Sequence, residues 1–177
     1  MSAGKLRRLS LTALFAALCC VATVILHIPS PLGGYFNMGD CIVLLAAAVL
    51  PPYYAMAAAG IGSALADLLL GASLYAPATL VIKALMAFVA YYFHAVFSKK
   101  NRPFSGMLLG SLSAELCMVL GYFLYEWCLY GLSPSAYNAL TLNLPQAAVS
   151  IAGGLVLWTV LEKTNLLKKT KRGINHV

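Results

Sequence analysis

The sequence predicts an all-α integral membrane protein. We expect a bundle of six transmembrane helices with both termini in the cytoplasm and a long, re-entrant or lid-like first outer loop. Of the 177 residues, 62% are hydrophobic and only 10% are charged, whereas soluble domains average about 25% charged residues. The apolar residues form six runs, and all but one of the 12 basic residues fall on one side of them. This composition excludes a soluble enzyme, a disordered region and a fibrous repeat.

The first apolar run covers residues 10–27 and follows the basic residues Lys5, Arg7 and Arg8. Basic residues before an apolar run are also typical of secretory signal peptides. We expect the chain to keep this helix, because the run is longer than the apolar part of a usual signal peptide. In addition, no small-x-small cleavage pattern follows it.

The second run, residues 40–50, is unusually short and ends at Pro51 and Pro52. Eleven helical residues cover only about half of the hydrocarbon thickness. The run follows a proline- and glycine-rich connection, residues 28–39. Irregular backbone is tolerated at membrane depth only where it is buried in protein or lines a cavity. The connection is therefore expected to dip into the protein beside a binding site.

The remaining runs have the length of membrane-spanning helices and are bounded by charge, proline or glycine. They cover residues 53–71, 78–97, 105–130 and 143–162. In the last of them Asn143 can cap the helix, and Pro145 is tolerated in its first turn. We expect a single membrane domain followed by a basic cytoplasmic tail, residues 163–177.

The basic residues predict the orientation of the bundle. Six spans place both termini on one side, together with the connections 51–52 and 98–104, and this side holds every basic residue except Lys83. The opposite connections, residues 28–39, 72–77 and 131–142, hold none. Positive charge marks the cytoplasmic side, so both termini are expected inside and the three uncharged connections outside.

Polar residues in the predicted spans share one depth, near the outer ends of five different helices. Charged side chains are costly in lipid and normally face the bundle interior. A few polar groups among aromatic side chains are the usual composition of a small-molecule site. The candidate substrate-binding residues are Asn37, Asp40, Asp67, Tyr75, Lys83, Tyr122, Glu126, Trp127, Asn143 and Gln146. Further aromatic residues on this side are Tyr35, Phe36 and Tyr137.

Simpler structural roles stay open for several of these residues. Asp67 and Lys83 can form an ion pair that ties the third and fourth spans together. Asp40 can cap the short second helix, and the aromatic residues can belong to an interfacial belt. Glu115 lies deeper, where it can face a lower cavity or bond to a neighbouring serine.

The sequence offers no catalytic or metal-binding set. The five cysteines show no CxxC spacing and no metal-ligand spacing with the three histidines. HExxH, GxSxG and Walker A motifs are absent. The basic residues form short clusters between apolar runs, which does not fit a nucleic-acid partner. We expect no enzyme activity, no metal and no cofactor in this chain.

Small residues form two further patterns. Ala13 and Ala17 lie four residues apart on the first helix, and Ala55, Ala59 and Gly62 follow a similar spacing on the third. Such faces allow helices to approach closely. They fit either packing within the bundle or docking to another membrane subunit.

Several motifs resemble the substrate-binding S component of energy-coupling factor (ECF) vitamin transporters, in particular the riboflavin-type branch, which includes hydroxymethylpyrimidine and pyridoxine proteins. The stretches that carry the resemblance are AxxxA at Ala13 and Ala17, GGYFNMGD at residues 33–40, LLAAAVLPP, GIGSALADLLLG at residues 60–71 and YAPATLVIKALMA at residues 75–87.

The resemblance implies a multi-pass protein of the bacterial cytoplasmic membrane that binds a vitamin and has no ATPase of its own. Its implied partners are a transmembrane scaffold subunit and two cytoplasmic ABC ATPase subunits, which hydrolyse the ATP. The AxxxA helix would face the scaffold, which places Ala13 and Ala17 at that contact.

Three function classes were compared: a transporter's binding subunit, a small integral membrane enzyme, and an accessory membrane subunit without a ligand. The polar groups at one depth and the family resemblance favour the first. A pocket with carboxylates, amides and aromatic rings suits a compact heteroaromatic ring with hydroxyl groups. It holds one basic residue, which disfavours phosphorylated ligands. We expect a pyridoxine-like or hydroxymethylpyrimidine-like vitamin, with riboflavin as the main rival.

Overall fold

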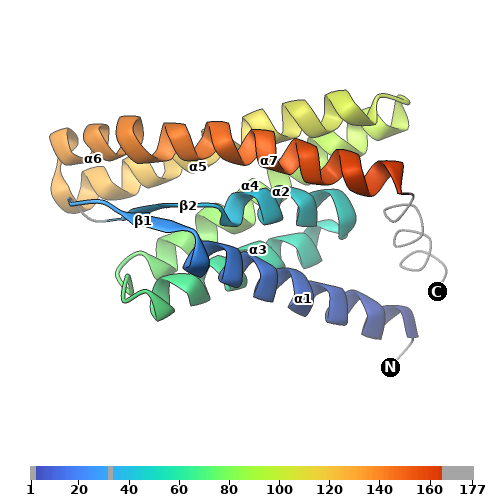
Figure 1. Ribbon diagram of the computed structural model, residues 1–177, viewed down its shortest axis with the longest axis horizontal. Helices are drawn as coiled ribbons and strands as arrows, with labels where there is room; N and C mark the ends of the chain where they lie inside the picture. Colours follow the sequence, from blue (N-terminus) through green and yellow to red (C-terminus); the bar gives the residue numbers. More distant parts are fainter. Residues whose placement is uncertain (1–2, 32–33, 165–177) are drawn as a thin grey trace.

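The computed structural model describes residues 3–31 and 34–164, which form a bundle of helices with one short β-hairpin at one end (Figure 1). The elements in chain order are α1 Ala3–Ile25, β1 His27–Pro29, β2 Tyr35–Asn37, α2 Gly39–Val49, α3 Pro52–Leu69, α4 Ala76–Lys99, α5 Pro103–Tyr130, α6 Leu132–Asn138, the π-helical turn η1 Ala139–Asn143, and α7 Leu144–Lys163. Most of the predicted basic tail lies outside the described residues.

Helix α2 occupies the centre of the bundle. It packs against α1, α3, α4 and α7, and all of its residues except Ile42 are buried. A helix that contacts neighbours on every side is apolar all round, which explains its run of valine, leucine and alanine. Around it, α4 packs along both α3 and α5, and α1 packs along α3. The predicted short second helix is confirmed.

Four segments of the described chain are long and apolar enough to cross a membrane. They are Gly4–Ile25, Ala76–Lys99, Pro103–Tyr130 and Leu132–Lys163. Their outer faces carry exposed leucine, valine and isoleucine side chains, which suits contact with lipid. The protein is therefore a multi-pass membrane protein.

The all-α prediction is confirmed for the bundle, and the connection between α1 and α2 adds two short antiparallel strands to it. Ile28 pairs with Phe36, and the strands are joined by a connection that includes Gly34 with φ 73°. Glycine adopts this left-handed backbone without the steric cost that other residues meet. The connection therefore returns on itself as a hairpin over the end of the bundle.

The prediction of a loop at residues 131–142 is wrong, because residues 132–143 are helical. After Gly131, whose φ of 86° ends α5, the chain resumes helical structure at Leu132 and continues without a break into α7. Pro134 lies in the first turn of α6, where its missing N–H has no helical partner to lose. Asn143 makes no capping hydrogen bond, because the last helix does not begin there.

The glycines of α3 allow its neighbours to approach closely. A Cβ atom on Gly62 would lie 2.3 Å from the backbone oxygen of Ala16 in α1, and one on Gly60 would lie 2.7 Å from the backbone oxygen of Leu80 in α4. Ala55 and Ala59 are fully buried. The small residues predicted on α3 therefore serve packing within the bundle.

The two ends of the bundle differ (Figure 1). Both ends of the described chain lie at one end, whereas the hairpin, the α3–α4 connection and the α5–α6 connection lie at the other. This arrangement agrees with the predicted grouping of the connections. We call the end of the bundle that holds the hairpin the hairpin end.

Candidate ligand-binding site

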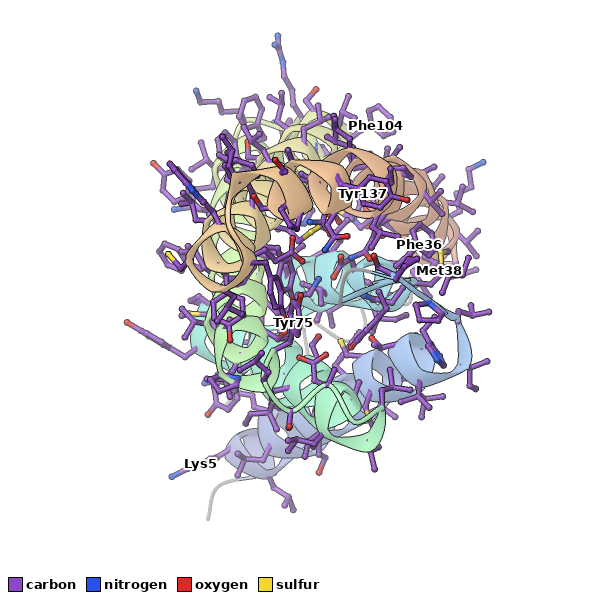
Figure 2. All side chains as sticks on the ribbon, turned by 90° about the vertical axis from the view of Figure 1, so that its left-hand side faces the viewer. Lys5, Phe36, Met38, Tyr75, Phe104 and Tyr137 are labelled. Carbon is purple, nitrogen blue, oxygen red and sulfur yellow. The ribbon has the colours of Figure 1, made fainter. Side chains whose placement is uncertain are left out.

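A pocket opens at the hairpin end, and its lining comes from the hairpin and five helices as well as the π-helical turn. The lining residues are Thr23, Gly34, Tyr35, Asn37, Ser63, Asp67, Tyr75, Thr79, Lys83, Tyr122, Glu126, Leu142, Asn143 and Gln146. All of the predicted binding residues except Asp40 and Trp127 are among them. In the view from this end (Figure 2), Tyr75 lies near the middle of the bundle, whereas Lys5 and Phe104 lie at its periphery.

The pocket is narrow. Its cavity volume, measured as the space open to the centre of a water-sized molecule, is about 30 Å³. This interior is enough for water but not for a heteroaromatic ring. A vitamin-sized ligand therefore requires the hairpin or the lining side chains to move.

The floor of the pocket holds a buried ion pair between Lys83 and Asp40. The Lys83 Nζ atom lies 2.5 Å from Asp40 Oδ1, and the two side chains are 2% and 0% exposed. Gln146 donates from Nε2 to the other carboxylate oxygen at 2.6 Å. The ammonium group also lies over the Tyr122 ring, 5.4 Å from its centroid. Two charges can be buried in this way only because each is paired and hydrogen-bonded.

This ion pair decides between roles that the sequence left open. Lys83 pairs with Asp40 and not with Asp67. Asp40 is likewise not the cap of α2, because the cap position is Met38 and no side chain caps this helix. The carboxylate of Asp40 instead points sideways into the bundle, toward α4 and α7.

Asp67 accepts a hydrogen bond from the Tyr35 hydroxyl of strand β2. Burial raises the pKa of the Tyr35 hydroxyl above its usual range, so the group stays protonated and can donate. Tyr75 donates in the same way to Glu126 at 3.3 Å, and burial raises its pKa as well. Two tyrosines thus each engage one oxygen of a pocket carboxylate.

Four polar atoms of the pocket wall have no hydrogen-bond partner among the described residues. They are Ser63 Oγ, Asp67 Oδ2, Glu126 Oε2 and Asn143 Nδ2. Leaving a buried polar group unpaired costs about 1–3 kcal/mol. Such atoms in a pocket wall are available to a ligand: two carboxylate oxygens accept, an amide donates, and a hydroxyl does either.

Trp127 does not reach the pocket. Its side chain is 50% exposed and lies 6.0 Å from the Phe123 ring, centroid to centroid. The prediction that it contacts the ligand is therefore not supported by its position. Glu115 also lies outside the pocket lining, fully buried in α5, with neither carboxylate oxygen bonded within the described part of the chain.

Six residues of the pocket lining were not among the predicted binding residues: Thr23, Gly34, Tyr35, Ser63, Thr79 and Leu142. Helical spacing could have found two of them. Ser63 lies four residues before Asp67, and Thr79 lies four residues before Lys83, so each shares a helix face with a predicted site residue.

A second depression, the α1–α3 groove, lies on the outer surface of the bundle. Its volume on the same measure, the space open to the centre of a water-sized molecule, is about 550 Å³, and it is lined by Leu9, Thr12, Ala13, Ala16, Ala17, Cys20, Val21, Ala57, Ile61 and Leu65. Ala13 and Ala17 are exposed in it. Packing against Gly62 uses the neighbouring Ala16 instead, so the AxxxA face itself remains open.

Comparison with known proteins agrees with this architecture. The family model described as the S component of the ECF-type riboflavin transporter matches residues 4–164. A protein of Pyrococcus woesei, described as an uncharacterized protein in a gap 3' region, is 37% identical over 139 residues, which cover 76% of this chain and 89% of that protein. No cluster of three or more histidine, cysteine or acidic residues suited to a metal ion occurs in residues 3–31 and 34–164. The match across nearly the whole chain shows that it belongs to the family of ECF-type riboflavin transporter S components.

Proposed function

We propose that the protein is the substrate-binding subunit of an ECF-type importer and binds a small water-soluble vitamin or precursor in the pocket at the hairpin end. The observation that carries this proposal is the set of four unpartnered polar atoms in a buried, aromatic-lined pocket. An accessory subunit without a ligand has no use for such atoms. Family membership supports a role in vitamin uptake.

The charges of the pocket restrict the ligand. Asp40 neutralises Lys83, which leaves Asp67 and Glu126 without a cationic partner among the described residues. Among the charged groups of the described pocket wall, a phosphorylated ligand would meet two carboxylates and a lysine that is already paired. We propose a neutral or positively charged heteroaromatic ring that carries hydroxyl or amino donors, such as a pyridoxine-like or hydroxymethylpyrimidine-like compound.

Riboflavin is the second candidate, because the description of the matching family model names it. Its ribityl chain supplies several hydroxyl donors that could satisfy the same acceptors. The larger flavin ring system demands a greater expansion of the pocket than a single ring does. The two candidates therefore differ in how far the hairpin must move.

We further propose a topology of six spans in the bacterial cytoplasmic membrane, with α6, η1 and α7 together forming the sixth. Both termini would be cytoplasmic, and the hairpin end would face outward. This proposal is supported by the basic residues of the described chain other than Lys83, which lie toward the end opposite the pocket (Figure 1). An outward-facing pocket would receive the vitamin from outside the cell.

The proposed partners are the transmembrane scaffold subunit and the two ABC ATPase subunits, which would supply the energy. The α1–α3 groove is the proposed contact with the scaffold, because Ala13 and Ala17 leave an apolar depression that a helix can enter. Replacing both alanines with tryptophan should abolish co-purification with the scaffold and leave vitamin binding intact.

A matched control exists on the same helix. Leu14 and Leu18 have the same spacing and are 53% and 41% exposed, but they lie outside the groove. Replacing them with tryptophan should leave assembly intact. Equal loss of assembly in both double variants would refute the assignment of the groove.

The proposed ligand can be tested on the purified protein. Mass spectrometry should first identify any retained compound, and calorimetry should then compare pyridoxine, hydroxymethylpyrimidine and riboflavin. Asp67→Asn and Glu126→Gln should each weaken binding at least about tenfold, or about 1.4 kcal/mol, because each removes an acceptor for the ligand. Trp127→Phe, outside the pocket, is the control. A folded protein that binds none of these compounds would overturn the proposal.

A further inference from the structure

A line of buried hydrogen bonds runs from the ion pair in the floor of the pocket to the hairpin. Lys83 donates to Asp40 at 2.5 Å, and Gln146 donates from Nε2 to the same carboxylate at 2.6 Å. The Gln146 Oε1 atom accepts from the Asn37 backbone N–H at 2.8 Å and from Asn37 Nδ2 at 3.2 Å. Four elements, β2, α2, α4 and α7, are thereby joined: Gln146 of α7 bonds directly to α2 and β2, and α4 joins through Asp40.

The direction of each bond in this line follows from the charge of Asp40. An ionised carboxylate only accepts hydrogen bonds, so Gln146 must present its nitrogen to Asp40 and its oxygen to Asn37. Asn37 must then present its donors to Gln146. Its own side-chain oxygen is left to accept from the Gly39 backbone N–H at 2.9 Å and from Thr23 Oγ1 at 3.4 Å.

Gln146 therefore differs from the other polar residues of the pocket wall. Both its oxygen and its nitrogen are engaged within the protein, and its side chain is 2% exposed. Asn143, less than one turn earlier in the same helical segment, has an unpartnered amide nitrogen. Both side chains line the same pocket, but of the two only Asn143 has an amide NH₂ group without a hydrogen-bond partner among the described residues.

We infer that Gln146 is a positioning residue that fastens strand β2 of the hairpin to the Lys83–Asp40 ion pair, rather than a ligand contact. This inference rests on the proposed function for its meaning, because the hairpin lies over the binding pocket. Opening of the hairpin would break the two bonds from Asn37 to Gln146 as well as the bond from Tyr35 to Asp67. Gln146 thus controls how readily the hairpin opens.

The test uses the ligand-free protein and amide hydrogen–deuterium exchange over residues 34–38. Gln146→Met has a similar volume but neither polar atom. Gln146→Asn keeps the amide but is one methylene shorter, so it cannot reach both partners. Both variants should speed exchange of the amides of residues 34–36 about tenfold or more, which corresponds to about 1.4 kcal/mol of hairpin stability. The Asn37 amide is left out of this comparison, because it loses its own acceptor in both variants.

The matched control is Ser150→Ala. Ser150 lies about one turn further along α7, is fully buried and does not line the pocket. Its replacement should leave exchange in the hairpin unchanged. If both Gln146 variants exchange at the rate of the unmodified protein, Gln146 does not hold the hairpin and the inference is wrong. Should Gln146→Met not fold, the polar variant Gln146→Asn decides alone.

This outcome is separable from that of the proposed function, because exchange is measured without any vitamin. Faster hairpin exchange in a protein that binds none of the tested vitamins would refute only the proposed ligand. Conversely, unchanged exchange together with weakened vitamin binding in the Gln146 variants would make Gln146 a ligand contact and refute only the positioning role.

Discussion

Removal of Lys83 should destabilise the protein severely, because it leaves the Asp40 carboxylate buried without a counter-charge. The two side chains are 2% and 0% exposed and their charged atoms lie 2.5 Å apart. Removing one partner of a buried ion pair typically costs about 3–5 kcal/mol. For a chain of this length, that corresponds to a fall in melting temperature of about 6–20 °C. Lys83→Met should reach this range.

The double variant Asp40→Asn/Lys83→Met should recover much of the loss, since it removes both charges together. Thermal unfolding of the detergent-solubilised single and double variants gives the coupling energy of the pair. We expect a coupling of about 2 kcal/mol or more. The parallel cycle of Lys83→Met with Asp67→Asn is the control, because Asp67 bonds to Tyr35 instead.

Coupling of Lys83 to Asp67 that equals or exceeds its coupling to Asp40 would refute this reasoning. It would support the Asp67–Lys83 ion pair that the sequence left open and would show that Asp40 does not stabilise Lys83. Additive single variants in both cycles would show that neither carboxylate stabilises Lys83. The comparison thus tests the connectivity of the charged groups and not merely their burial.

Three further predictions concern the hairpin, the packing of α1 and the topology. Tyr35→Phe removes the hydrogen bond to Asp67, and a hydrogen bond to a charged group contributes about 1.5–3 kcal/mol. In stopped-flow measurements the retained vitamin should therefore associate and dissociate about tenfold faster. Unchanged rates would show that this bond does not restrain the hairpin. Gly62→Val should lower the unfolding free energy by at least about 1–3 kcal/mol, because a Cβ atom there would lie 2.3 Å from the backbone oxygen of Ala16. Thermal unfolding measures this loss. A variant as stable as the unmodified protein would contradict the close contact between α1 and α3. A single cysteine at position 73, introduced as Ser73→Cys in a protein without other cysteines, should react with an impermeant reagent in intact cells, and labelling only after lysis would reverse the topology.

The helices and the location of the site could be predicted from the sequence, because both depend on position along the chain. Apolar runs fixed the approximate ends of the helices, and counting from those ends placed the charged residues near one end of the bundle. Eight predicted residues meet in one pocket for this reason: Asn37, Asp67, Tyr75, Lys83, Tyr122, Glu126, Asn143 and Gln146.

The pairing of those residues could not be predicted in the same way. Depth along a helix axis does not give the direction in which a side chain points around it, and Asp40 and Asp67 lie at similar depth. Lys83 reaches Asp40 because α2 packs in the centre of the bundle beside α4. Trp127 was misplaced for the same reason, since it lies at the expected depth but on the outer face of α5.

The hairpin and α6 were missed because proline and glycine were taken as signs of irregular chain. Strand pairing in the hairpin depends on contact between His27–Pro29 and Tyr35–Asn37, and neither segment has a strand pattern long enough to recognise. In α6, Pro134 falls in the first turn and does not interrupt the helix. Proline and glycine content alone does not distinguish an irregular loop from a short hairpin or from the first turn of a helix.

The π-helical turn η1 determines which asparagines face inward. Asn138 and Asn143 are both buried, although five residues apart, while Leu140 and Thr141 between them are exposed. In a regular α-helix, residues five apart diverge by about 140° around the axis. The wider turn brings both asparagines to the inner side, where Asn138 accepts a hydrogen bond from Ser30 of the hairpin connection at 2.8 Å. Loss of a single residue from this turn would rotate α6 relative to α7 by about 100°. It would turn Asn138 away from Ser30 while α7 kept its packing, so the length of this turn sets whether α6 can hold the hairpin connection.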